Sequence, residues 1–456
     1  MYAKTNFIVF SLMLIASFFH PFEDGKMFFL VVEFLVANLF CSLLKEEVFF
    51  SVPLFIIRIT GFFRYIAIAY AMKLENMVPI SLDVFLLMSY EMVVVYISVF
   101  IYDRMFCPND VLVFPEDKMC TNLYPKRGWL SVVVFLAGLL YCILNPVLLK
   151  NMFVLSREGK ISVDFSSGFF AIVSSLFLIL SFSYIVEYIE RFKLSSNVKF
   201  FLLFVPSIFF ISNMSISADS TSRWSMLISM VIVYYTILQY HPEKKRLLKI
   251  LGLFLLAVVL IFGTMMKFSH IDSKYNKYTS TSDVVSTMFS FRDLNSYFSG
   301  PQNVEVGYQV SRYVENSDLS KMALLISDVF HNFPILNKYV ADEELNSVRL
   351  FNRFYYNTNF IVDQIIPLVS QANMYFGFFL FVPIFLIVIC AFKIYSLLKP
   401  NMGFLERYCV IYAFFSFSLI NCLNFTIFFQ QLWIKIAPVF LLVWFEKKIL
   451  AKRSLQ

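Results

Sequence analysis

Long apolar stretches recur along this chain, and they restrict its fold more than any other feature. A helix that crosses a bilayer needs about 20 mostly apolar residues, because it rises about 1.5 Å per residue through a hydrocarbon layer about 30 Å thick. Twelve stretches meet or approach this requirement, at residues 6–20, 27–44, 48–72, 80–102, 129–149, 166–189, 198–213, 224–240, 247–266, 374–398, 404–423 and 425–446. We therefore predict an all-α polytopic membrane protein with about 12 transmembrane helices.

Two features of this pattern leave eleven spans as the alternative. The first and seventh stretches are short, and little more than the four residues NCLN separates the last two. The N-terminal stretch resembles a signal peptide, but no small-x-small cleavage site precedes the polar residues that follow it. We interpret it as a retained first transmembrane helix.

The composition supports the membrane class and excludes several functions. Charged residues make up 15% of the chain, against roughly 25% in globular proteins, and the mean hydropathy is +0.73. The net charge of +7 is modest and follows from topology, so nucleic acid is not an expected partner. No Walker A loop, HExxH motif or metal-binding cluster is visible, so neither a metal nor a cofactor is expected. All seven cysteines are expected to be free thiols, namely Cys41, Cys107, Cys120, Cys142, Cys390, Cys409 and Cys422.

The basic residues predict the orientation of the spans. Lysine and arginine collect in the short cytoplasmic loops of membrane proteins. The N-terminus, the even-numbered loops and the C-terminal tail hold nineteen of them, whereas the short odd-numbered loops hold six. Both termini are therefore predicted to be cytoplasmic. We therefore expect residues 1–266 to carry spans 1–9, residues 267–373 to form a large loop on the outer (periplasmic) side, and residues 374–456 to carry spans 10–12 and a cytoplasmic tail.

The loop at residues 267–373 is a polar island in an apolar chain. It holds nine Lys and Arg against eleven Asp and Glu, and it lacks the composition of a linker. An outward loop of this length without linker composition is usually functional, with a passive ectodomain or partner surface as the alternative. Apolar residues from Leu319 to Phe330 recur at helical spacing, which predicts a helix on the membrane surface or against the bundle. Pro334 is expected to end it.

Five arginines are predicted to face outward and are candidates for binding a pyrophosphate. They are Arg223, Arg292, Arg312, Arg349 and Arg353. A guanidinium group matches phosphate oxygens with two parallel hydrogen bonds and does not lose its charge. Arg349 and Arg353 are four residues apart, so they share a helix face. For any single arginine, solvated surface charge is the competing interpretation.

Three further residues of the island are candidate catalytic groups, namely His331, Asp363 and Glu305. A histidine at the membrane surface accepts a proton from a sugar hydroxyl near neutral pH. His331 follows an apolar helix and precedes a turn, although a helix-end residue that bonds carbonyl groups fits the same position. Glu305, Asp328 and Asp363 are the acidic alternatives for the same role.

Four charged residues lie inside predicted spans, where an ion normally faces a partner or a water-filled cavity. Arg58 and Glu91 both fall near mid-membrane, and Arg64 and Glu33 both fall in the outer third. These depths predict the pairs Arg58–Glu91 and Arg64–Glu33. Ion pairs that hold helices together are one interpretation, and a cavity in which Arg64 admits a phosphate is the other.

The order of these elements resembles the bacterial O-antigen polymerases of the Wzy type. Those proteins share the span number, the cytoplasmic termini and the large late outward loop. Short stretches carry the resemblance in residues: YFSGPQN at 297–303, HNFPILN at 331–337, the segment 357–379 that leads through a glycine into the next span, and SADSTSRWSML at 217–227.

The resemblance implies a metal-independent glycosyltransferase of lipopolysaccharide biosynthesis in the bacterial inner membrane. A growing glycan would pass from undecaprenyl pyrophosphate to a new lipid-linked repeat unit on the periplasmic face. The implied partners are the undecaprenyl-pyrophosphate-linked oligosaccharide, the lipid bilayer and a chain-length regulator protein. An O-antigen ligase and a lipid-linked oligosaccharide flippase are the alternatives, although a flippase usually lacks so long an outward loop. A membrane scaffold fits the buried and outward arginines less well.

Overall fold

The computed structural model is all-helical, without a strand among the residues it describes. Those residues are 2–19, 21–107, 129–146, 168–215, 223–248, 250–252, 290–330, 333, 346–357, 364–399 and 402–453.

The N-terminal part is a set of long apolar helices joined by short turns. Its elements are α1 (Tyr2–Phe19), α2 (Gly25–Phe40), η1 (Cys41–Leu43), α3 (Glu46–Phe49), α4 (Val52–Gly61), η2 (Phe62–Ala67), α5 (Ile68–Leu74), α6 (Leu82–Ile101) and η3 (Tyr102–Phe106). Asp24, Ser51 and Ser81 cap α2, α4 and α6, because each side chain accepts a backbone N–H of the following first turn. These caps define where the helices begin.

The middle and C-terminal parts complete the bundle. The middle elements are α7 (Trp129–Leu144), α9 (Gly168–Arg191), α10 (Ser196–Leu202), α11 (Phe204–Ser215), α12 (Arg223–Tyr240) and η4 (Pro242–Lys244). The C-terminal elements are α20 (Leu368–Phe376), η5 (Gly377–Leu380), α21 (Phe381–Tyr395), α22 (Phe404–Ser418), α23 (Phe425–Gln431), η6 (Leu432–Ile436) and α24 (Ala437–Arg453).

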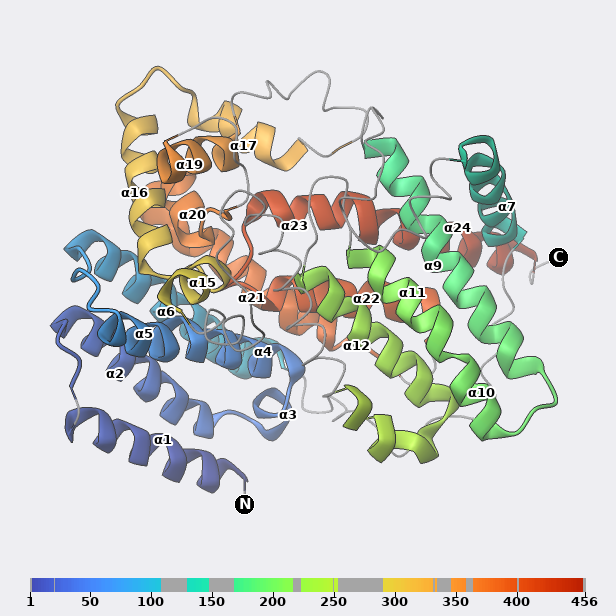
Figure 1. Ribbon diagram of the computed structural model, residues 1–456, viewed down its shortest axis with the longest axis horizontal. Coiled ribbons are helices and arrows are strands. Elements are labelled where there is room, and N and C mark those ends of the chain that lie inside the picture. The colour runs from blue at the N-terminus through green and yellow to red at the C-terminus, as the bar shows by residue number, and fades with distance from the viewer. Residues whose placement is uncertain are drawn as a thin grey trace, which may run out of the picture.

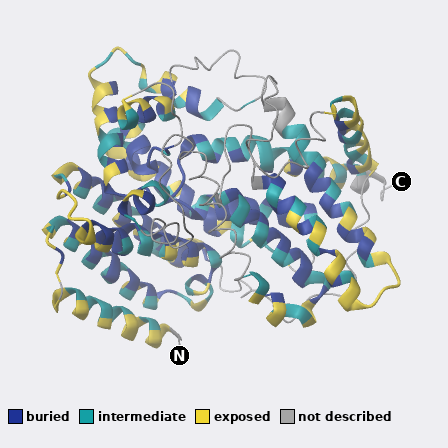
Figure 2. Cartoon of the chain, viewed as in Figure 1, coloured by how far each residue is buried: buried dark blue, intermediate teal, exposed yellow. Residues whose placement is uncertain are grey.

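The C-terminal helices lie between two groups of earlier helices (Figure 1). On one side α21 packs on α6 and α22 on α4, and on the other α22 packs on α12 and α24 on α7. Burial is therefore densest along α22, whereas α1 and α7 are largely exposed at the edges (Figure 2). Exposed apolar residues on such edge helices are what a lipid-facing surface requires.

The polar island folds as helices that pack on the bundle. Its described elements are α15 (Phe291–Tyr297), α16 (Pro301–Glu315), α17 (Lys321–Phe330) and α19 (Ser347–Tyr356). Helix α16 packs on α6, α19 and α20, and α17 packs on α20 and α23. A second apolar core of the island, which includes Val310, Leu324 and Phe351, reaches Met374 of α20. The island is thus continuous with the membrane helices rather than a separate domain.

Seven described helices are long and apolar enough to cross a membrane, which supports a polytopic membrane protein. They are Gly25–Leu43, Val52–Leu74, Leu82–Phe106, Ile172–Arg191, Ser196–Met214, Leu368–Tyr395 and Phe425–Ile449. Ala3–Phe19, Trp129–Leu144 and Trp224–Tyr240 are shorter apolar helices. The predicted span 247–266 falls mostly outside the described residues, so the count of twelve stays a prediction.

The ends of two predicted spans differ from the structure. The tenth begins at Leu368 instead of residue 374, because Pro367 starts the helix and the polar residues that follow are buried in the protein. The eleventh, α22, ends at Ser418 instead of residue 423, and it is not among the described helices long and apolar enough to cross a membrane. Residues 419–424 form a buried turn, whose apolar side chains resemble a continued helix in sequence.

The predicted helix in the island is confirmed as α17, but a different face of it is buried. Leu324, Ser327 and Asp328 point inward, whereas Met322 and Ile326 are exposed. The helix turns this way because Asp328 finds hydrogen-bond donors in the bundle, described below. Free thiols are confirmed for the six described cysteines, and Cys120 lies outside the described residues.

A close approach between α16 and α20 gives a test of this docking. A Cβ atom on Gly307 would lie 2.5 Å from the Cβ and Oγ atoms of Ser370, so Gly307→Ala should cost about 1–3 kcal/mol of overpacking. We expect a lower thermal midpoint for the purified protein in detergent. Gly25→Ala, where the added Cβ meets nothing within 4 Å, is the control. Adding Ser370→Gly to Gly307→Ala should restore the midpoint, and failure to restore it would contradict the packing.

Candidate functional site

A buried ion pair lies inside the bundle, between η2 and α6. Nη2 of Arg64 lies 2.6 Å from Oε2 of Glu91, and both side chains are fully buried. Asn421, in the turn between α22 and α23, accepts a hydrogen bond from Nη1 of Arg64 at 3.4 Å. The amide of Asn421 in turn donates to Thr60 Oγ1 at 3.0 Å. The pair therefore connects three separate segments of the chain.

The predicted pairs Arg58–Glu91 and Arg64–Glu33 are wrong. Arg58 instead donates to the side-chain oxygens of Asn38 and Asn6, and Glu33 accepts a hydrogen bond from Ser89 at 3.0 Å.

The error comes from where the helix that carries both arginines begins. Ser51 caps it and Pro53 follows, so the span runs from Val52 to Leu74 and not from residue 48. Its midpoint lies beside Arg64, which therefore meets Glu91 at the same depth. Both groups are enclosed, so the observed geometry fits a link between helices rather than an open cavity.

The polar centre of the island is Asp328, which is 1% exposed. Its carboxylate accepts hydrogen bonds from the Ser347 backbone N–H at 3.2 Å and from the Gln371 amide at 2.8 Å. The hydroxyl groups of Ser347 and Tyr375 also donate to it. Gln371 extends the contacts to Thr426 Oγ1 at 3.1 Å. We call these five residues the seam network, because they join α17 and α19 of the island to α20 and α23 of the bundle.

Burial dominates the titration of Asp328. Removal from water raises the pKa of this carboxyl, although the hydrogen bonds from Ser347, Tyr375 and Gln371 favour the charged form. A satisfied carboxylate in this setting holds helices together. Because the carboxylate is buried and its oxygens accept these hydrogen bonds, we assign Asp328 the role of holding the helices of the seam network in place.

The YFSGPQN stretch forms the corner between α15 and α16. Gly300 caps α16, and the Asn295 side chain accepts from the Gln302 backbone N–H and donates to Asn303 Oδ1. Phe298 leaves this corner and stacks on Phe63, with ring centroids 4.7 Å apart. It also meets Trp224 edge-on at 6.0 Å. The corner thus anchors the island on η2 and on the start of α12.

The described arginines of the predicted pyrophosphate group lie on exposed helix faces. Arg349 and Arg353 share one face of α19, as predicted from their spacing, and both are exposed. Arg292 and Arg312 are exposed on α15 and α16, and Arg312 donates to the hydroxyl of Tyr308 at 3.1 Å. Arg223 is the first residue of α12, and its side chain is not among those described. Binding of one pyrophosphate by several of these arginines together stays a prediction.

Asp328, one of the acidic candidates for the catalytic base, is the buried group of the seam network; of the other three candidates, the structure describes only Glu305. It is partly buried on α16 and accepts a hydrogen bond from the Ser81 hydroxyl at 2.5 Å. Ser81 is also the cap of α6, so Glu305 fastens α16 to the start of a span. His331 and Asp363 lie outside the described residues. Among the described residues, no cluster of His, Cys, Asp and Glu is suited to hold a metal ion.

Sequence reasoning missed Lys435, a lone cation within the last predicted span. It lies in the π-helical segment η6, and Nζ donates to the backbone carbonyl of Met214 at 2.8 Å. The ammonium also lies 5.4 Å from the centre of the Tyr412 ring. In the described chain, π-helical segments also carry Arg64 and Asp103, and such segments occur frequently at functional sites. A single Lys amid apolar residues is the sequence signal that identifies it.

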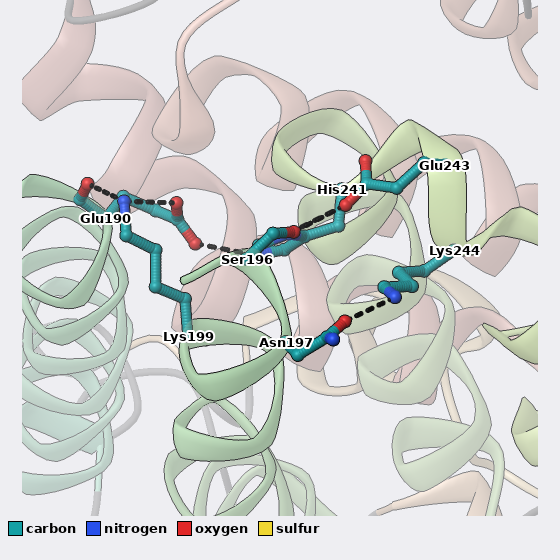
Figure 3. A network of polar contacts seen from close by, with 7 residues as sticks. All are labelled: Glu190, Ser196, Asn197, Lys199, His241, Glu243 and Lys244. Atoms are coloured by element: carbon teal, nitrogen blue, oxygen red, sulfur yellow. Dashed lines mark hydrogen bonds and ion pairs between the residues drawn. The ribbon is translucent and has the colours of Figure 1, made fainter. Parts of the chain in front are cut away.

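Sequence reasoning also missed a polar network at the opposite end of the bundle, around His241 (Figure 3). The imidazole is buried, with Nε2 at 2.8 Å from Glu190 Oε1 and Nδ1 at 3.0 Å from Ser196 Oγ. Ser196 donates to Glu243, and Lys199 donates to the backbone carbonyl of Glu190. The network ties the end of α9 to α10 and η4. Because its polar groups bond one another, we interpret it as a structural link.

The comparisons with known proteins add no relative. No family model, curated protein or solved structure matches this chain.

The buried ion pair should behave as a structural link. Glu91→Leu leaves the Arg64 guanidinium buried without a counter-ion, which costs about 3–5 kcal/mol, so the protein level in membranes should fall. The double variant Arg64→Met with Glu91→Leu should recover most of that level, and Glu23→Leu, at an exposed position, should leave it unchanged. A double variant with normal level and no activity would instead assign the pair to a substrate cavity.

The raised pKa of Asp328 gives a pH test. An unfolded aspartate has a pKa of about 3.9, whereas the folded state holds the proton of Asp328 to higher pH. The contribution of this group to stability is therefore fully present below the unfolded pKa and is lost as pH rises through the folded pKa. We expect the melting temperature in detergent to fall over this window, and Asp328→Asn to remove that part of the dependence. Asp318→Asn, at an exposed position, is the control; identical profiles for Asp328→Asn and wild type would refute the assignment.

Proposed function

We propose that this protein is a membrane glycosyltransferase that polymerises an oligosaccharide carried on undecaprenyl pyrophosphate, on the side of the inner membrane that bears the island. The observation that supports it most is the way the island joins the bundle. The seam network and the Phe298 corner hold four polar helices directly against the ends of membrane helices. A passive ectodomain does not require such docking, whereas an enzyme on a lipid-linked substrate needs protein groups at the level of the lipid headgroup.

The chemistry that such a site performs is a substitution at a sugar carbon. The terminal hydroxyl oxygen of the acceptor repeat unit attacks the anomeric carbon of the donor glycan, and the bond from that carbon to the pyrophosphate oxygen breaks. Undecaprenyl pyrophosphate leaves with the bonding electrons, and a base takes the hydroxyl proton. Because the leaving group is already a pyrophosphate, the reaction needs no nucleotide.

The residues proposed for these roles are groups of the island. His331, Asp363 or Glu305 would take the proton, and cationic groups would neutralise the leaving pyrophosphate. Arg349 and Arg353 fit the second role best among the arginines described on the island, because two exposed guanidinium groups on one helix face match one pyrophosphate. Cytoplasmic termini and a chain-length regulator as partner belong to the same proposal.

Deletion of the gene in its natural host tests the proposal. We expect surface lipopolysaccharide with a single repeat unit and no long ladder on a gel, and we expect the wild-type gene to restore the ladder. A mutant without any surface repeat would indicate a flippase, and long chains that accumulate on undecaprenyl pyrophosphate would indicate a ligase. A normal ladder would contradict all three functions.

A further inference from the structure

Lys435 differs from Arg64 and Arg58, the two arginines deep in a described span, in the partners it has. Arg64 has a carboxylate and Arg58 has two amide oxygens. For Lys435, no carboxylate among the described residues lies within ion-pair distance of Nζ, and its contacts are one backbone carbonyl and one ring. An ammonium group has three donors, so two remain for a ligand. An ion inside a span that lacks a counter-ion indicates a functional site.

The surroundings place Lys435 on the same side of the bundle as the island. Met214, which accepts its hydrogen bond, lies in the last turn of α11. Tyr412, whose ring it contacts, bonds Ser225 in the first turn of α12. The neighbouring Trp433 donates to the Val329 carbonyl of α17 at 2.9 Å. Helices α11 and α12 thus end and begin beside Lys435, at the level where α17 meets α23.

This position suits the headgroup of a lipid with a phosphate group. Lys435 is only partly buried, and it lies beside the end of α11 and the start of α12. The side chain as a whole is neither fully enclosed by the bundle nor fully exposed. Trp433 with Phe330 and Phe333 forms an aromatic group next to it, with ring centroids 6.2 and 4.9 Å from the Trp433 ring. These apolar rings provide a surface for a prenyl chain.

We propose that Lys435 binds the phosphate oxygens of a polyprenyl-pyrophosphate lipid. This inference rests on the proposed function and deepens it, because it assigns the lipid headgroup to a residue of the bundle in addition to the arginines of the island. The carbonyl of Met214 and the Tyr412 ring hold the ammonium in place. The two remaining N–H groups bond the anion.

The test uses the full-length protein in detergent and measures binding of geranylgeranyl pyrophosphate. We expect Lys435→Gln to weaken binding about tenfold or more, because it removes a charged hydrogen bond, while Lys435→Arg retains most of it. Lys448→Gln is the matched control, since Lys448 lies on the same helix over the Trp444 ring at 3.9 Å but near the other end. Geranylgeraniol should not bind, and inorganic pyrophosphate should bind weakly and lose affinity in Lys435→Gln.

Thermal midpoints separate a structural role from a binding role. Glutamine keeps a donor for the Met214 carbonyl, so we expect Lys435→Gln to melt within a few degrees of the wild type. Equal binding by Lys435→Gln and wild type, or no binding by the wild type, would overturn the inference. Loss of binding in Lys435→Gln together with a normal ladder in the deletion strain would support the lipid site and reject the polymerase. If deletion abolishes the ladder, and a Lys435→Gln variant that binds the lipid normally restores it, the polymerase function would be supported and the lipid site at Lys435 rejected.

Discussion

One buried carboxylate, Asp328, determines how the polar part of this protein meets its membrane part. A carboxylate without water must receive hydrogen bonds from protein groups, because an unsatisfied buried acceptor is strongly unfavourable. The donors come from Ser347 of the island and from Gln371 and Tyr375 of the bundle. Satisfying this group therefore requires α17, α19 and α20 to lie together, which turns the island into a cap on the membrane helices.

Ions inside the bundle also need polar partners, and the described ions fall into two kinds according to whether they have a partner of opposite charge. Arg64 and Glu91 neutralise each other and are enclosed, so they contribute to the arrangement of helices. Lys435 is only partly buried and has no acidic partner among the described residues, which is the basis for the lipid site that we propose there. The structural ions and the proposed lipid site are thus separate features of one bundle, and they can be varied independently.

Much of the architecture could be predicted from the sequence, because hydrophobic length is a strong signal in a membrane protein. The existence of α17 and the shared face of Arg349 and Arg353 also followed from helical spacing. The ion pairs could not be predicted in this way. The helix begins after its cap Ser51, a few residues later than hydropathy indicates, and this start places Arg64 closer to mid-membrane.

The buried face of α17 and the role of Lys435 were missed for a different reason. They depend on partners such as Gln371 and Met214, which are distant in sequence. Hydropathy along the chain shows which segments are apolar, but it does not show which polar groups meet across helices. The catalytic assignments to His331 and Asp363 stay predictions, since both lie outside the described residues.

Hydrogen–deuterium exchange of the protein in lipid nanodiscs tests most directly whether the island is part of the bundle. If the island is docked on the bundle, peptides from α16 and α19 should exchange slowly, on the timescale of the α6 span, because their amides open only when the island undocks. Exchange of α16 and α19 within seconds, while α6 stays protected, would show a detached ectodomain and contradict the account.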